Sequence, residues 1–189
     1  MNVLMIDTSG KHLTVAVQKG ERTYCRFDEC NLQHSVRLNV FIEELLQEAQ
    51  LTLAQIDVYA CNVGPGSFTG IRVGVATLKA FLTVYEKKAV AVNSLEILAY
   101  NTKGRVETAM DAGRGYWYVA EFENGQCVKE PYLSEERPQN AVLFEEAKNN
   151  SQEFVAVVLD KVRRGAYAEK LSPLYLRKSQ AEVERERKG

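Results

Sequence analysis

The residues from Asn62 to Gly74 have the sequence NVGPGSFTGIRVG, which gives the clearest indication of the fold. Its glycines and its proline indicate a turn between two regular elements. The apolar residues 57–63 (DVYACNV) come before the turn and predict a buried strand. Residues 71–85 come after it, and their apolar positions recur at helical spacing. The stretch is therefore expected to connect a strand to a helix in an α/β fold.

The segments before and after this stretch complete the first part of the fold. Three short patterned segments, 3–8, 12–19 and 21–28, predict an antiparallel meander, and a helix is expected over 33–50. A strand over 89–92 leads to a helix whose start is marked by Asn93 and Glu96, the pattern of a capping box. Antiparallel strands followed by parallel crossovers predict a mixed sheet. This order is the layout of the actin-like and sugar-kinase (ASKHA) fold.

The pattern changes after residue 102, where a second, smaller unit is expected. Strands are predicted over 105–110, 116–123 and 126–129, followed by a helix near 139–149, a strand over 154–159 and an extended piece at 172–176. We therefore expect an N-terminal actin-like lobe over 1–101 and a smaller C-terminal α/β lobe over 102–176, each a mixed sheet with helices. Residues 177–189 are expected to form a charged, flexible tail.

Composition narrows the class of protein. The chain has 189 residues, of which 46% are hydrophobic and 26% charged, as in an ordinary globular protein. No apolar run approaches the ~20 residues of a membrane span, and the N-terminus lacks a signal-peptide pattern, so a cytoplasmic protein is expected. The formal net charge of -1 indicates that, if the protein acts on RNA, another component holds most of the RNA. The four cysteines lack zinc-site spacing and are expected to be reduced thiols.

Two turns are candidate binding sites. Asp7, Thr8 and Ser9 offer a carboxylate and two hydroxyls that suit a phosphate or a hydrated metal, although the same residues are common turn formers. The loop 64–70 precedes a helix, where backbone N–H groups favour anions. It is not a Walker loop, and it fails the dinucleotide fingerprint because the third glycine would fall at Thr69. A sharp structural turn is the simpler interpretation of this loop.

Hydrolase chemistry is not supported by the residues. The sequence has only two histidines, and it lacks the zinc-protease pattern His-Glu-x-x-His.

Helix 71–85 indicates a contact with another helix. It has an aliphatic face and a second face of small residues, with only a narrow polar strip. A helix that is apolar on most sides must be covered on most sides. One face can pack on the sheet, and the other needs another helix, from this chain or from a partner.

Several motifs resemble those of the TsaB (YeaZ) family. The most specific is the signature run 62–74, which contains Gly64, Pro65, Gly66, Ser67, Phe68, Thr69, Gly70 and Arg72. The N-terminal Ile6–Ser9 and the C-terminal Pro173–Arg177 are also similar to family motifs. Residues 111–118 (DAGRGYWY) are similar to the family's Asp-Ala-Arg-Arg stretch, but Gly113 stands where an arginine is usual.

The resemblance implies a scaffold subunit without catalysis of its own. The family pairs with its paralogue TsaD and works with TsaE to transfer threonylcarbamoyl from threonylcarbamoyl-AMP to tRNA adenosine beside the anticodon, in tRNAs that read codons beginning with A. TsaD carries a metal-binding His-x-x-x-His motif, and its two histidines align with Ser94 and Leu98 here. Neither side chain can replace an imidazole ligand. No catalytic residue, cofactor or metal is therefore expected, and tRNA contact is expected through the complex.

The family's subunits pair through their first two helices, which agrees with the second apolar face of helix 71–85. We expect contact, with TsaD or in a homodimer of the isolated protein, through Val36, Val40, Val73, Ala76, Thr77, Ala80 and Val84. The alternatives are a small-molecule kinase or nucleotide-binding enzyme of the same fold, in which Asp7 would bind a metal, and a metallopeptidase, which the missing ligand motif argues against.

Overall fold

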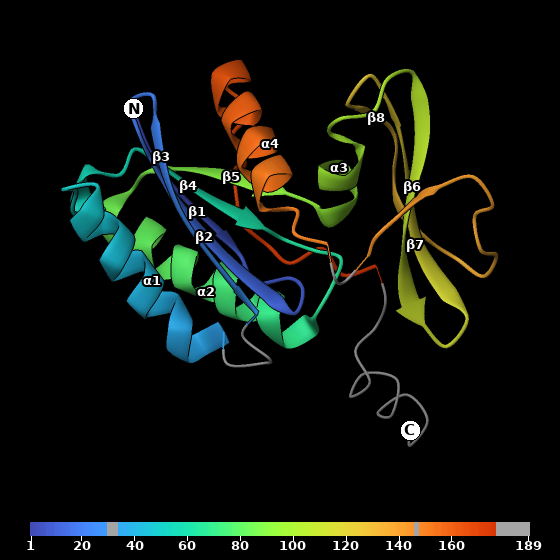
Figure 1. Cartoon of the computed structure of the whole chain (residues 1–189), viewed down its shortest axis with the longest axis horizontal. Coiled ribbons are helices and arrows are strands. Elements are labelled where there is room, and N and C mark those ends of the chain that lie inside the picture. The colour runs from blue at the N-terminus through green and yellow to red at the C-terminus, as the bar shows by residue number, and fades with distance from the viewer. Residues whose placement is uncertain (30–33, 146–147, 177–189) are drawn as a thin grey trace.

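The first lobe is built on a five-stranded mixed sheet. The computed structural model describes residues 1–29, 34–145 and 148–176, and it places the strands in the order β3-β2-β1-β4-β5. The first three strands pair antiparallel, whereas β4 and β5 run parallel to β1 (Figure 1). The bounds are β1 Asn2–Asp7, β2 His12–Lys19, β3 Arg22–Glu29, β4 Val58–Asn62 and β5 Lys88–Val92. The expected meander and parallel crossovers are confirmed.

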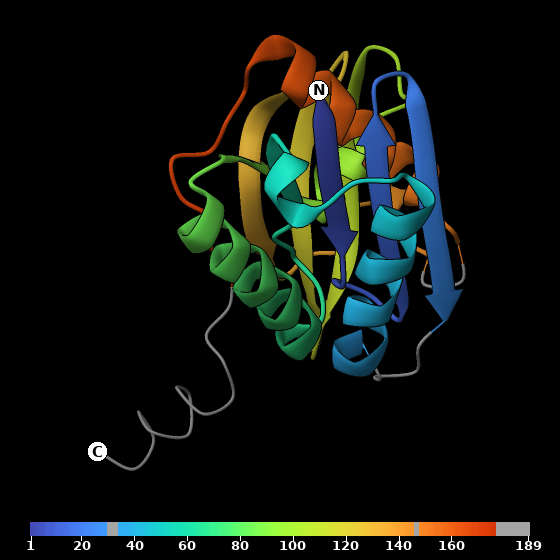
Figure 2. The ribbon, with the colours of Figure 1, turned by 90° about the vertical axis from the view of Figure 1, so that its left-hand side faces the viewer.

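Helices cover both faces of this sheet. On one face lie α1 (His34–Glu48) and α2 (Phe68–Tyr85), which stand in front of the strands in Figure 2. Alternate residues of β1 define the two sides: Leu4 and Ile6 pack in the core under α1 and α2, whereas Val3 and Met5 pack under α4 (Ser151–Arg164). A strand that is buried on both faces must be apolar throughout, which explains the continuous apolar run of β1.

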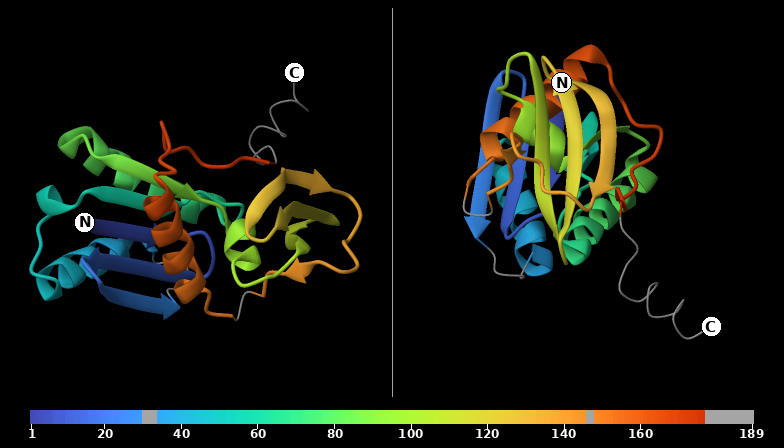
Figure 3. Two further views of the ribbon diagram at one scale, coloured as in Figure 1. Left: turned by 90° about the horizontal axis from the view of Figure 1, so that it is seen from above. Right: turned by 90° about the vertical axis from the view of Figure 1, so that its right-hand side faces the viewer.

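The second lobe is a four-stranded mixed sheet in the order β8-β7-β6-β9. Its strands are β6 Arg105–Gly113, β7 Tyr116–Glu123, β8 Gln126–Ser134 and β9 Val142–Leu143. The short helix α3 (Ser94–Ala99) packs on this sheet through Leu95 and Ala99. The same helix contacts α4, so it lies between the two lobes (Figure 3). A 3-10 turn, η1 (Leu53–Gln55), completes the elements before β4.

Two predicted elements are wrong. The helix expected near 139–149 is absent from the described part of that range, which holds the short strand β9, and the strand expected over 154–159 lies inside helix α4. The valines of this segment favour strands in general, which misled the prediction. Their spacing decides the structure, because Phe154, Val157, Val158 and Val162 form one buried stripe at helical intervals. Gly165, with φ of +69°, then ends the helix.

The position of α4 also bears on the expected division at residues 101 and 102. The second sheet does follow residue 102, but α4 returns to pack on β1, β4 and β5 of the first sheet. After α4, Ala168 also contacts the first sheet, because its backbone N–H donates to Ala89 O at 2.8 Å. Residues 151–171 therefore pack with the first lobe. Among the described helices, none has the length and apolar character needed to cross a membrane.

Candidate functional site

The turn after β1 is held by its own side chains. The Ser9 backbone N–H and hydroxyl both donate to Asp7 Oδ1, at 2.8 and 2.7 Å. Asn62, at the end of the parallel strand β4, donates from Nδ2 to Asp7 Oδ2 at 2.9 Å. Both carboxylate oxygens of Asp7 therefore have partners within the chain. Asp7, Thr8 and Ser9 lie together in this turn, and their side chains bond other groups of the chain.

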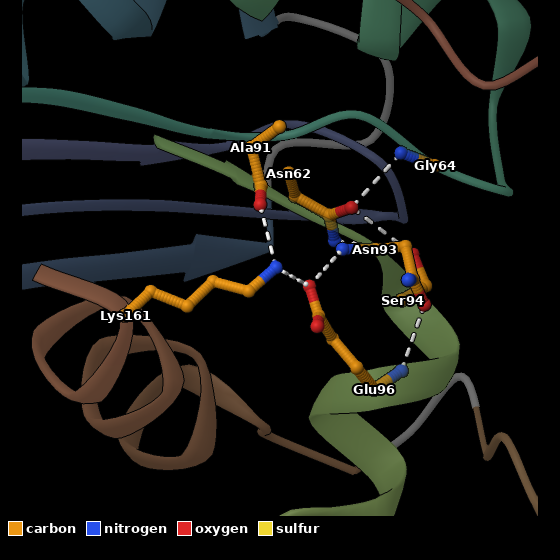
Figure 4. Close-up of polar contacts among 7 residues, drawn as sticks. All are labelled: Asn62, Gly64, Ala91, Asn93, Ser94, Glu96 and Lys161. Atoms are coloured by element: carbon orange, nitrogen blue, oxygen red, sulfur yellow. Dashed lines mark hydrogen bonds and ion pairs between the residues drawn. The ribbon is translucent and has the colours of Figure 1, made fainter. Parts of the chain in front are cut away.

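Asn62 organises the polar cluster around this turn. It is 1% exposed, and its Nδ2 also lies 2.9 Å from Ser9 Oγ, while its Oδ1 accepts the Gly64 N–H at 2.9 Å. Ser94 Oγ lies 3.1 Å from Asn62 Nδ2 and donates to Pro65 O at 2.7 Å (Figure 4 shows Asn62, Gly64 and Ser94). Ser94, which the resemblance aligns with a TsaD histidine, thus supports the signature loop. The role of Asn62 was not predicted from the sequence, although its position at the end of a predicted strand could have indicated it.

The glycines of the signature loop allow the loop to touch the turn directly. A Cβ atom at Gly70 would lie 2.0 Å from Thr8 O, and one at Gly66 would lie 2.3 Å from Ser9 O. Two hydrogen bonds fix the contact: Thr8 Oγ1 donates to Gly70 O and the Ser67 N–H donates to Ser9 O, each at 2.7 Å. The signature therefore has a packing role, since no side chain fits between these backbones.

Beside the turn, a small hollow separates the lobes. It has a volume of about 40 Å³ and is lined by Asp7, Asn62, Phe144 and Lys148, among others. Sites for drug-sized ligands have volumes of roughly 300–1,000 Å³. In this conformation the hollow has no room for a nucleotide, so the arrangement does not support the kinase alternative.

A partly buried ion pair joins three elements next to this cluster. Lys161 of α4 donates from Nζ to Glu96 Oε1 at 2.7 Å and to Ala91 O of β5 at 2.8 Å (Figure 4). Glu96 also caps α3, because its Oε1 accepts the Asn93 N–H at 2.7 Å, and the predicted capping box is confirmed. Burial raises the pKa of Glu96, and Lys161 only partly opposes this effect. The pair ties the interlobe helix to the back of the first sheet.

The signature loop also meets the C-terminal motif. Phe68 stacks on Tyr175 with ring centroids 5.4 Å apart, and Arg72 Nε donates to Tyr175 Oη at 2.8 Å. The Leu174 N–H donates to Val63 O at 2.8 Å, which anchors the same segment to the end of β4. Two motifs that are about a hundred residues apart therefore form one unit. Arg177, the last residue of the motif, and the tail to Gly189 lie outside the described residues, as do Cys30 and the side chain of His34.

The expected partner surface lies on α1 and α2, and we call it the helix face. Three of its valines are exposed large hydrophobic residues: Val36 at 68%, Val40 at 46% and Val84 at 70%. Ala76 and Ala80 are exposed as well, and Val73 and Thr77 are half-buried. All seven residues thus have some exposed surface on two neighbouring helices (Figure 2). Exposed apolar side chains gathered on two neighbouring helices are typical of a protein–protein contact.

The remaining residues singled out by sequence have structural roles. Leu98, which the resemblance aligns with the other TsaD histidine, packs against the core of the second lobe. Gly113 has φ of +73° at an irregularity of β6, a conformation that disfavours the arginine usual in the family. Cys25 and Cys127 are exposed and Cys61 is buried, all as free thiols. Within the described part of the chain, no three His, Cys, Asp or Glu side chains gather in a metal-binding arrangement.

Comparisons with known sequences match a model of the TsaD family and several TsaB proteins. A profile of the TsaD family, described as tRNA N6-adenosine threonylcarbamoyltransferase, matches residues 28–137. TsaB of Escherichia coli is 30% identical over 154 residues, which cover 74% of this chain and 67% of that protein. TsaB of Buchnera aphidicola is 30% identical over 125 residues, covering 64% of this chain and 60% of that protein. The chain thus spans about 60–67% of the length of these curated relatives.

Two solved structures share the fold over most of the chain. YeaZ from Pseudomonas aeruginosa superimposes with a TM-score of 0.76 at 23% identity, covering 93% of this chain and 99% of that one. A second Pseudomonas aeruginosa structure, described as similar to the peptidase YeaZ, gives a TM-score of 0.79 with the same identity and coverage. The two-lobed architecture of mixed sheets is therefore the actin-like fold that was expected.

Proposed function

The chain belongs to the TsaB (YeaZ) family, and from this premise we propose that it acts in tRNA threonylcarbamoyladenosine biosynthesis as a scaffold subunit that binds TsaD. In this role it activates the transfer of threonylcarbamoyl to tRNA adenosine by its partner, together with TsaE, and has no independent catalysis. The chain spans only part of the length of its curated relatives, so both its activity and its partners are part of what we propose.

The helix face is the observation that carries the proposal. Val36 and Val84 are more than two-thirds exposed, which costs free energy in water unless a partner covers them. Ala76 and Ala80 lie on the same side of α2 as Val84, and small side chains let another helix approach closely. TsaD is the proposed occupant, and a second copy of this chain is the occupant when TsaD is absent.

The proposed lack of catalysis is supported by the roles of two residues. Ser94 and Leu98 stand where the resemblance places the metal-binding histidines of TsaD. Ser94 is 4% exposed and bonds the signature loop, and Leu98 belongs to an apolar core. Asp7, the residue on which a kinase would depend, has both oxygens occupied by Ser9 and Asn62. These side chains hold the lobe together, which is what a scaffold requires.

Reconstitution tests this proposal. The chain is added to TsaD and TsaE from the same organism, with tRNA, ATP and threonylcarbamoyl-AMP, and modified adenosine is measured by mass spectrometry. We expect transfer only when the chain is present, and neither transfer nor ATP hydrolysis by the chain alone. ATP hydrolysis by the purified chain that is abolished by Asp7→Asn would overturn the proposal in favour of an enzyme.

A further inference from the structure

A second hollow lies on the edge of the first lobe, and we call it the lysine pocket. It has a volume of about 360 Å³ and lies between the C-terminal half of α2, the start of β5 and the segment 167–171. Ala168 and Ala89 form an isolated antiparallel β-bridge, which holds the segment against β5. Four lysines from these three parts of the chain line the pocket: Lys79, Lys87, Lys88 and Lys170.

The charges of the lysine pocket are not balanced by its surroundings. Glu169 is the acidic residue that lines the pocket, and the salt bridges of the described residues involve none of the four lysines. The C-terminus of α2 contributes a partial negative charge of about half a unit. Even when this charge and the nearby Glu86 are counted, the positive charge remains in excess. A free anion would therefore be attracted to this position.

The shape and lining of the pocket suit a chain of phosphates better than a single buried ion. Lys79, Lys87, Lys88 and Lys170 are all exposed, so their ammonium groups remain able to reach an extended ligand. Lys88 Nζ lies 4.4 Å from the centroid of the Tyr167 ring, which gives the pocket an aromatic wall. Lysine ammonium groups bind nucleic-acid phosphates without regard to sequence.

We propose that the lysine pocket binds the phosphate backbone of RNA, so that part of the tRNA lies against this subunit beside α2. This inference rests on the proposed function, which makes tRNA the RNA at hand. Lys79 and Ala80 are neighbours on α2, so the pocket adjoins the helix face. An RNA bound there would lie next to the proposed TsaD contact, and the two subunits could hold it together. The net charge of -1 describes the whole chain and conceals this local surplus.

A charge reversal measures the contribution of the pocket. The variant Lys79→Glu/Lys170→Glu is compared with Arg22→Glu/Lys103→Glu, which makes the same change in charge at exposed positions outside the pocket. Binding of fluorescent unmodified tRNA is measured by anisotropy at several salt concentrations, for the full chain and for its complex with TsaD. Urea denaturation of each variant verifies that it is folded.

We expect the pocket variant to raise the Kd for tRNA about tenfold and to lower the slope of log K against log salt by about one for each lysine. The control variant should leave both nearly unchanged. An equal loss of affinity in the two variants, or no loss in either, would overturn the inference.

The transfer assay separates this inference from the proposed function. If the pocket variant binds tRNA as tightly as the wild type while the wild type still activates transfer, the pocket inference fails and the scaffold proposal stands. If the wild type does not activate transfer, the scaffold proposal fails, and the comparison of tRNA affinities still decides the pocket.

Discussion

Arg72 Nε donates a hydrogen bond of 2.8 Å to the hydroxyl of Tyr175, a residue 103 positions later in the chain. The bond joins the first turns of α2 to the segment that follows α4. Arg72 also lies over both neighbouring rings, with its Cζ 5.8 Å from the centroid of Phe68 and 5.5 Å from that of Tyr175. The family signature and the C-terminal motif therefore stabilise each other.

Tyr175→Ala should lower the free energy of unfolding by about 1–2 kcal/mol, because it removes both the ring stack and the hydrogen bond. Tyr175→Phe keeps the stack, and it should lose about half as much or less. Urea denaturation measures both losses. Tyr175 is 50% exposed, so the loss stays modest, and an alanine variant as stable as the wild type would show that the contact contributes nothing.

Gly70→Ala should destabilise the fold by about 3 kcal/mol, because the new Cβ would lie 2.0 Å from Thr8 O and the backbone must move. Gly10→Ala is the matched control, since its Cβ would meet nothing closer than 3.9 Å, and it should change stability by less than about 1 kcal/mol. Thermal and urea denaturation give the comparison. Equal effects of the two substitutions would contradict the packing role of the signature.

Ala80→Arg should weaken pairing by about 100-fold, because a guanidinium would have to lose its water at the centre of the helix face. The fold should persist, since Ala80 is exposed and arginine is a good helix former. Analytical ultracentrifugation of the chain alone and with TsaD reports the dissociation constants. Ala166→Arg makes the same change at an exposed position after α4, and there the pairing should be unaffected.

The partly buried Glu96 predicts a pH dependence of stability. A carboxyl whose pKa is higher in the folded than in the unfolded state binds more protons when folded, so its contribution falls as pH rises. The loss of stability begins near the ordinary glutamate pKa of 4.5 and is complete above the raised pKa of Glu96 in the folded protein. The stability of the wild type relative to Glu96→Gln should therefore decline as pH rises through this range.

Urea denaturation between pH 4.5 and 7.5 tests this dependence. Glu21→Gln removes a carboxylate from the exposed turn between β2 and β3, and it is the control for the substitution itself. A wild type that gains stability over Glu96→Gln with rising pH would mean that the Lys161 ammonium outweighs burial.

Local patterns predicted most of the first lobe. The bounds of β2 match the prediction, and those of α1 and β5 agree within two residues, because alternation and helical spacing are properties of short segments. The capping box of Asn93 and Glu96 was recognised for the same reason. In α4, by contrast, the β-branched residues and the helical spacing pointed to different structures, and the spacing prevails because it forms the apolar stripe that packs on the first sheet.

The polar contacts of the candidate site could not be predicted in this way. Asp7 and Asn62 are 55 residues apart, and they meet because β1 and β4 are parallel neighbours that end at the same edge of the sheet. The contact between Arg72 and Tyr175 likewise depends on the path of the chain after α4. The resemblance pointed to the segments in which these residues lie, but contacts between side chains so far apart in the sequence depend on the tertiary fold.

Because α4 packs back onto the first sheet, its position determines which fragments of the protein can fold. The second sheet is an insertion within the first lobe, because the chain leaves that lobe after α3 and comes back to it with α4. A fragment that stops at residue 101 would lack Phe154 and Val158, and the apolar rear of β1, β4 and β5 would face water. Such a fragment should aggregate on expression, whereas a chain in which a short linker replaces the second sheet would retain every layer of the first lobe.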